Sequence, residues 1–165
     1  DSNSATTGES ILIVYFSESG NTEVIANYIH DEVGGDLVKL EPVNPYPEDY
    51  NELLDVAQEE QRSDARPRLA TAIDNIDQYD TVFIGYPNWW GDMPMLIYTF
   101  LETYDLSDKT IAPFNTSGGS GLSRTVAAIR EKQPNATITA GFTVLGDNVS
   151  RARNEVNDWL NEIGL

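Results

Sequence analysis

The sequence predicts an α/β fold, a five-stranded parallel sheet with helices on both faces. Five short apolar runs alternate along the chain with five segments of helical periodicity. Strands that alternate with helices pair in parallel through right-handed crossovers. The run 81–86, Thr-Val-Phe-Ile-Gly-Tyr, has no polar alternation, which is typical of a strand covered on both sides. A length of 165 residues suits one domain with one core.

The first half of the chain is interpreted as strand, helix, strand, helix. An apolar run at 11–16 predicts the first strand, and the following helix ends near Gly34-Gly35. Residues 37–40 form a short second strand that Pro42 stops. A second helix is expected over about 47–62, with an apolar face of Tyr50, Leu53, Leu54 and Ala57. Residues 63–79 are polar, and a short helix is expected at 69–73.

The second half repeats the alternation. The third strand, 81–86, leads into the loop 87–92 and then a helix opened by Pro94. The fourth strand is expected over 110–114, where Pro113 indicates a bulge or an early end, and a loop over 115–121 follows it. A helix at 122–132, a fifth strand at 136–144 and a final helix complete the chain, the last with an apolar stripe of Val149, Ala152, Val156, Trp159, Leu160 and Ile163.

Composition excludes several classes of function. With 27 acidic and 10 basic residues the formal charge is −17, which repels nucleic acid and anionic lipid and attracts a basic partner. There is no Cys, so disulfides, thiolate metal sites and thiol catalysis are excluded. The single His30 is expected to be a structural residue near the negative end of the first helix. No apolar run is long enough to span a membrane.

Residues 1–9 are small and polar without periodicity, so we expect a flexible leader there and the folded domain over 10–165. Such a leader is typical of the region after a removed secretion or lipoprotein signal. The compartment, cytoplasmic or extracytoplasmic, stays open, because a lack of Cys fits either side of a membrane.

The turn after the first strand, Ser17-Glu18-Ser19-Gly20-Asn21-Thr22, predicts a phosphate site. A helix that starts here directs unpaired N–H groups and its positive dipole end into the turn. The turn has no Lys or Arg, so neutral donors would hold the phosphate. The alternative is an ordinary capped helix, since the same residue types are common at caps. No ATP-type or dinucleotide-type glycine loop occurs in the chain.

Three loops of unusual composition follow strands one, three and four. In the strand order 2-1-3-4-5 these strands lie side by side, so the loops form one rim at the topological switch point. The second loop carries Trp89 and Trp90, which would stack on a planar ring. The alternative is that one indole fills the core and the other packs on the last helix. The third loop, Asn115 to Gly121, is glycine-rich and either lets backbone approach a ligand or is a flexible lid.

These motifs resemble those of flavodoxins over about residues 10–165. The first loop resembles the fingerprint that wraps the phosphate of FMN, and the other two resemble the ring-binding loops of a bacterial flavodoxin-like subfamily. The resemblance implies a flavodoxin-like fold with FMN as cofactor. It implies that the phosphate is held by Ser17, Ser19, Gly20, Asn21 and Thr22. It implies that the isoalloxazine is held by Pro87, Asn88, Trp89, Trp90, Gly91, Thr116, Ser117, Gly118 and Gly119.

The chain departs from electron-carrier flavodoxins in one respect. Those generally place an aromatic residue in the loop after strand four, and this loop has none, so the flavin is expected to be open on that side. Two functions therefore stay open: an FMN-binding electron-transfer protein with a basic redox partner, or an FMN-dependent NAD(P)H/quinone-type oxidoreductase that turns over a small molecule. No catalytic residue and no metal site are assigned.

Two readings from other classes are less favoured. A phospho-signalling receiver domain has the same strand order but needs an acceptor Asp after strand three and a Lys after strand five. Here strand three leads into Pro87-Asn88 and strand five into Leu145-Gly146-Asp147. A binding module without flavin is the other alternative, since a fold does not by itself determine function.

Overall fold

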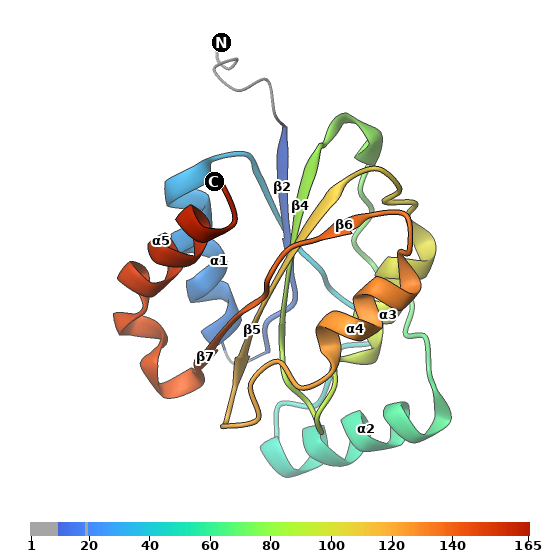
Figure 1. The fold of residues 1–165 in the computed structure, drawn as a ribbon. Helices are drawn as coiled ribbons and strands as arrows, with labels where there is room; N and C mark the ends of the chain where they lie inside the picture. The colour runs from blue at the N-terminus through green and yellow to red at the C-terminus, as the bar shows by residue number, and fades with distance from the viewer. Residues whose placement is uncertain (1–9, 19) are drawn as a thin grey trace.

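The computed structural model describes residues 10–18 and 20–165. The expected leader at 1–9 and the phosphate candidate Ser19 therefore lie outside the described residues. The sheet has the strand order β3-β2-β4-β5-β6, and β7 also pairs with β5 (Figure 1). All pairings are parallel. The predicted parallel α/β fold and its strand order are confirmed.

The strands agree closely with the apolar runs. They are β2 (Ile11–Tyr15), β3 (Asp36–Lys39), β4 (Thr81–Pro87), β5 (Thr110–Ser117), β6 (Thr137–Ile138) and β7 (Phe142–Leu145). The fifth predicted strand is split, because β6 and β7 pair with opposite ends of β5 and residues 139–141 between them belong to no strand.

The prediction that β5 bulges or ends at Pro113 is wrong. The strand continues to Ser117 and stays in register with β4, so Asn115, Thr116 and Ser117 are strand residues. The N–H of Thr110 donates toward β4, and the carbonyl of Ile111 accepts from Thr139 on the opposite side. Since successive residues alternate sides, the N–H that Pro113 lacks would face the interruption between β6 and β7, where no ladder bond is lost.

The helices are α1 (Asn21–Val33), α2 (Tyr50–Ser63), α3 (Met95–Thr103), α4 (Thr125–Lys132) and α5 (Arg153–Glu162), with 3₁₀ turns η1 (Ile76–Gln78) and η2 (Gly146–Arg151). Helices α1 and α5 cover one face of the sheet, and α3 and α4 cover the other (Figure 1). Side chains alternate along β2, so that Ile13 faces α1 and α5 while Val14 faces α3 and α4.

Helix α2 does not cover a face of the sheet. It lies beyond the edge at which the strands end (Figure 1), and of its side chains only Leu53 and Ala57 are buried. Asp49 caps it by accepting a hydrogen bond from the N–H of Glu52 at 3.0 Å. An apolar helix face with two buried residues is too narrow to cover a sheet. Helix α2 therefore lies beside the ends of the strands and not on a face of the sheet.

Two further local expectations need correction. The short helix expected at 69–73 does not form; Leu69 instead bridges Pro42 in antiparallel fashion. Five residues are too few to offset the cost of helix nucleation, and the N–H of Ala70 instead donates a hydrogen bond to the carbonyl of Glu41. Helix α4 begins three residues later than the predicted Leu122, after a turn closed by the Thr125 N–H donating to the Leu122 carbonyl.

The stripe expected in the last helix is correct in its burial. Five of its six residues are buried, Val149, Ala152, Val156, Trp159 and Leu160, whereas Ile163 is only partly buried. The first two precede α5, and Ile163 follows it. Within the described residues, none of the helices has both the length and the apolar character that a membrane crossing requires.

Candidate functional site

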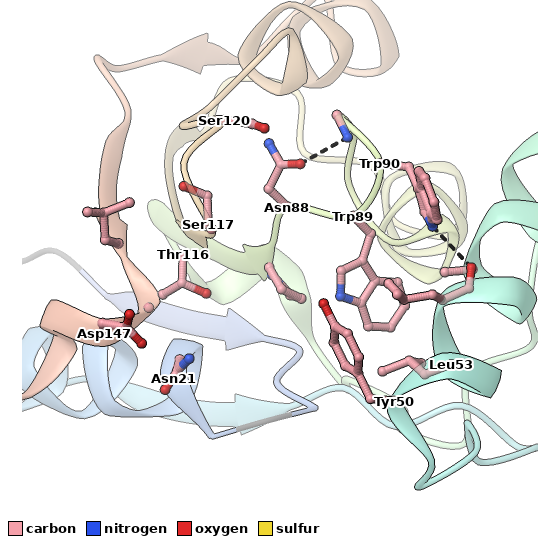
Figure 2. A pocket seen from close by; sticks show the side chains of 17 residues that line it. Asn21, Tyr50, Leu53, Asn88, Trp89, Trp90, Thr116, Ser117, Ser120 and Asp147 are labelled. Atoms are coloured by element: carbon pink, nitrogen blue, oxygen red, sulfur yellow. Dashed lines mark hydrogen bonds between the residues drawn. The ribbon is translucent and has the colours of Figure 1, made fainter.

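A cavity of about 620 Å³ lies at the edge where the strands end. Its walls are formed by the start of α1, by α2, by the loop after β4, and by the ends of β5 and β7. Figure 2 shows a polar side with Asn21, Thr116, Ser117 and Asp147, and opposite it a side with Tyr50, Leu53, Trp89 and Trp90. One cavity therefore joins the three loops that the sequence predicted would form one rim.

The start of α1 is capped by Ser17. Its Oγ accepts hydrogen bonds from the N–H groups of Gly20 (3.1 Å) and Glu23 (3.2 Å), and Gly20 takes the left-handed conformation that lets the chain turn into the helix. Thr22 is buried. Among the described residues of this turn, Asn21 lines the cavity and Ser17, Gly20 and Thr22 do not.

The turn after β7 approaches the start of α1 closely at Gly146. A Cβ atom at this position would lie 2.7 Å from Nδ2 of Asn21. Only glycine therefore leaves the Asn21 side chain where it is. Asp147, the next residue, is the one charged side chain among the described residues that line the cavity.

The end of β5 supplies hydroxyl and backbone groups. Thr116, Ser117 and Gly118 line the cavity, whereas Gly119 does not. The Oγ of Ser117 accepts from the N–H groups of Gly119 (3.3 Å) and Gly121 (3.1 Å). This hydroxyl therefore folds the glycine-rich loop back on the end of its own strand.

Asn88 fastens the loop after β4 to the loop after β5. Its Nδ2 donates to the carbonyl of Gly121 (2.8 Å) and to Oγ of Ser123 (2.9 Å), and its Oδ1 accepts from the N–H of Gly91 (3.0 Å). The Gly121 carbonyl also accepts from Nδ2 of Asn115 at 2.9 Å. A single amide thus fixes the spacing of two walls of the cavity.

The two adjacent indoles differ in environment. Trp89 packs edge-on against Phe16 and Tyr46, with ring centroids 5.5 and 5.2 Å away, and it adjoins the core cluster under α3. Trp90 is 48% exposed and has a φ of 55°. The indole Nε1 of Trp90 donates to the carbonyl of Leu54 at 3.0 Å. One indole thus contacts the core as the alternative held, and the other packs on α2, not on the last helix.

The loop after β4 is anchored from behind by Asp92. Its Oδ1 accepts from the N–H of Met93 (2.7 Å) and from the hydroxyl of Tyr98 (2.8 Å). Burial, then this hydrogen bond, raises the pKa of Tyr98 above its usual range. The guanidinium of Arg66 lies 5.1 Å from the Tyr98 ring centroid. The positive charge of Arg66 therefore lies behind the loop, and no Lys or Arg is among the described residues lining the cavity.

Several lining residues were missed as site residues by the sequence interpretation. They are Tyr50, Leu53, Leu54, Ala57, Ser120, Leu145, Gly146 and Asp147. The first four had been assigned to the apolar face of a helix, and periodicity does not distinguish a face on a core from a face on a cavity. Tyr50 is 69% exposed in the first turn of α2. It could have been recognised as a site residue from the sequence, because a large aromatic ring flanked by acidic residues is expected to be exposed.

Near the same edge, burial raises the pKa of Glu18 above its usual range, an effect that Lys39 opposes. The described residues contain no group of three or more His, Asp or Glu side chains that could hold a metal ion.

Comparison with known proteins finds one matching family and several similar structures. The model of the Flavodoxin family matches residues 10–163. A structure from Bacteroides eggerthii DSM 20697, provisionally named a flavoprotein, is 33% identical with a TM-score of 0.82, over 94% of this chain and 98% of that one. A similarly named Bacteroides uniformis ATCC 8492 structure is 29% identical with a TM-score of 0.83, over 93% and 99%.

A more distant similarity is to the structure of a flavoprotein in complex with FMN from Lactobacillus acidophilus NCFM. It is 23% identical with a TM-score of 0.73, over 92% of this chain and 98% of that one. At this identity the similarity shows the fold. The chain has no match among curated proteins.

Proposed function

The chain belongs to the flavodoxin family, and from this we propose that its cavity binds FMN and that the protein transfers electrons through the bound flavin. The observation that carries the proposal is a single cavity with a helix N-terminus on its polar side and indole rings on the other. FMN has the same two parts, a phosphate and a planar ring. The FMN complex of the Lactobacillus acidophilus flavoprotein supports the same cofactor.

For the phosphate, we propose the turn from Ser17 to Thr22, including Ser19. The N-terminus of the 13-residue helix α1 offers backbone N–H groups and its dipole. The N–H groups of Gly20 in this turn and of Glu23 in the first turn of α1 already bind Ser17 Oγ, and that hydroxyl still has its own hydrogen to donate. Asp147 beside this turn repels an anion, so the hydrogen bonds of the turn and the helix dipole would have to outweigh that repulsion.

For the isoalloxazine, we propose the segment 87–91 on one side and 116–119 on the other. The backbone N–H of Asn88 donates to the carbonyl of Thr116 at 2.8 Å, and its side chain binds Gly121 and Ser123 just beyond the second segment. The spacing of the two segments is therefore fixed, and a preorganised site loses less entropy when it binds. Trp89 and Trp90 supply aromatic surface, and the backbone around Gly118 is open, with no atom within 4 Å of a Cβ placed there. Ring-edge polar atoms can therefore approach the main chain closely.

The electron-transfer role, with a basic redox protein as partner, rests on the charge of −17. An FMN-dependent NAD(P)H/quinone-type oxidoreductase is the second candidate. The observation that favours it is the apolar wall of the cavity on α2, with the exposed ring of Tyr50, because a protein that only exchanges electrons with another protein needs no such wall for a small molecule.

The test is a titration of the purified protein with FMN and with riboflavin, followed by calorimetry and visible absorbance. FMN should bind far more tightly than riboflavin, because the phosphate contributes much of the affinity. No heat and no spectral change with excess FMN would refute the cofactor. Equal affinities for the two flavins would refute the phosphate assignment while leaving the ring site in place.

A further inference from the structure

Exposed large apolar side chains gather on the cavity. Among the described residues five are exposed, and three of these line it: Tyr50 (69%), Trp90 (48%) and Leu145 (45%). Single exposed apolar side chains are ordinary, but a group of them around one concavity marks a binding surface. The rings of Tyr50 and Trp90 belong to the α2 side, opposite Asn21 and Asp147 (Figure 2).

Trp90 is held in its exposed position from both ends. The indole Nε1 of Trp90 donates to the Leu54 carbonyl at 3.0 Å, and the backbone carbonyl of Trp90 accepts from Nε2 of Gln61 at 3.3 Å. A φ of 55° is unfavourable for a bulky residue, and such strain persists where the surroundings impose it, commonly at ligand sites. The indole is therefore fixed against α2 with much of its surface uncovered.

Charge restricts what this wall can bind. No basic side chain is among the described residues that line the cavity. Asp49, which caps α2, and Glu52 and Asp55 in the first turns of α2 are exposed. An anion at this wall would approach Asp49 and Glu52, and the N-terminus of α2 beside it is already capped by the Asp49 carboxylate. An uncharged ring meets no such penalty and gains aromatic contact.

We propose that Tyr50, Leu54 and Trp90 form a second subsite that takes a planar, uncharged aromatic molecule of about the size of a naphthoquinone, beside the cofactor. The inference rests on the proposed function, which places the FMN phosphate at the start of α1 and the FMN ring between the segments 87–91 and 116–119, with Trp89 as its aromatic contact. The subsite is the part of the α2 wall that lies beyond that ring. The inference names a substrate class for the same site: small neutral ring compounds, in preference to anionic ones.

The experiment uses two probes with one ring system, neutral 1,4-naphthoquinone and anionic 1,4-naphthoquinone-2-sulfonate, in equilibrium dialysis against FMN-loaded protein without reductant. The neutral probe should bind about tenfold more tightly than the sulfonate, a difference of one charge near acidic side chains. Tyr50→Ala should weaken binding of the neutral probe about tenfold, and Tyr50→Phe should keep it within about twofold, because the ring provides the contact.

Binding of FMN itself is measured on every variant, so that the two sites are separated. FMN affinity should change less than about twofold in Tyr50→Ala. Tyr28→Ala is the matched control: Tyr28 is a ring on α1 that packs 4.5 Å from the guanidinium of Arg153 and does not line the cavity. It should leave the binding of both probes unchanged.

Three results would overturn the subsite. They are no binding of the neutral probe, displacement of FMN in proportion to the probe bound, and an equal loss of FMN and probe affinity in Tyr50→Ala. If FMN itself fails to bind, the proposed function is wrong, and the neutral probe is then titrated into the unloaded protein. Binding that depends on Tyr50 there supports the subsite, and its absence overturns it.

Discussion

The hydroxyl groups of Thr22 and Thr116 lie 2.8 Å apart in the protein interior. Thr22 belongs to the second position of α1, and Thr116 to the end of β5. This hydrogen bond joins the element proposed to hold a phosphate to the strand proposed to hold a ring, 94 residues later in the chain. The relative position of the two ends of the site depends on it.

Replacing either threonine with valine keeps the shape but leaves one buried hydroxyl unpaired. Thr22→Val and Thr116→Val should each lower the free energy of unfolding by about 1–3 kcal/mol. The double variant should lose less than the sum, because it leaves no unpaired group. Urea unfolding of all four proteins measures this. Additive losses would mean that the two hydroxyls do not interact.

Gly146 determines where the Asn21 side chain can lie, since a Cβ there would come within 2.7 Å of its Nδ2. Gly146→Ala should therefore displace that amide and weaken FMN binding by about fivefold, the loss of roughly one hydrogen bond. In an Asn21→Ala background the same change should have little further effect. A similar loss in both backgrounds would show that Gly146 acts in another way.

The two indoles should have separable roles. Trp89→Ala removes a ring that packs on Phe16 and Tyr46 and should destabilise the fold by about 3–5 kcal/mol, or less if the partly buried site collapses. Trp90→Ala should cost much less stability. We expect bound FMN to lose most of its fluorescence through stacking on one of the two, and the matching variant to restore it. Trp159→Ala, in α5, should change stability alone. Unchanged quenching in both loop variants would contradict the stacking.

Alternation predicted the parallel sheet but not its strand order, and 2-1-3-4-5 was taken as one known order for such a sheet. Within that order, the rule that parallel strands end at one edge predicted the meeting of three loops. The sequence could not place α2, because Leu53 and Ala57 give the same periodicity against a sheet or beside a cavity. It misjudged Pro113, since the side of the strand that a proline N–H would face depends on where the neighbouring strand is interrupted. Such features depend on tertiary pairing, which local pattern does not contain.

Glu102 should make the stability depend on pH at the acid end. Its carboxylate accepts from Nε of Arg66 (3.0 Å) and Nζ of Lys132 (2.9 Å). These hydrogen bonds, that from Arg66 first, lower its pKa from 4.5 to about 2. Since the folded value is the lower one, the stabilisation is complete above about pH 4.5 and is lost as the pH falls through about 2.

The size of this contribution is limited, because the carboxylate is 40% exposed and water screens it. Glu102→Gln should therefore lower the stability slightly at pH 6 and reduce its slope between pH 4.5 and 2. Urea unfolding across this range, at low and high salt, measures both. An identical slope in the variant and the parent would show that other carboxylates dominate acid unfolding.

The net charge of −17 should affect both the driving force and the partner of electron transfer. Full reduction adds negative charge to the flavin, and the acidic side chains Glu18, Asp92 and Asp147 lie on or beside the loops that form the cavity, which disfavours that charge. The fully reduced cofactor should therefore be a strong reductant. The same charge should attract a positively charged redox protein and accelerate the encounter.

Salt separates the two candidate functions. Exposed charges are screened beyond a Debye length of about 10 Å at 0.1 M, so transfer to a basic protein should slow steeply as salt rises. Turnover of NAD(P)H with a neutral quinone would need no protein partner and should depend little on salt. The measurement reduces the flavin with nicotinamide alone, then adds a basic redox protein, each across a salt series. Rapid reduction by nicotinamide alone, without salt-sensitive transfer to the protein acceptor, would favour the oxidoreductase function over the electron-carrier function, because the flavin would then react directly with a small molecule.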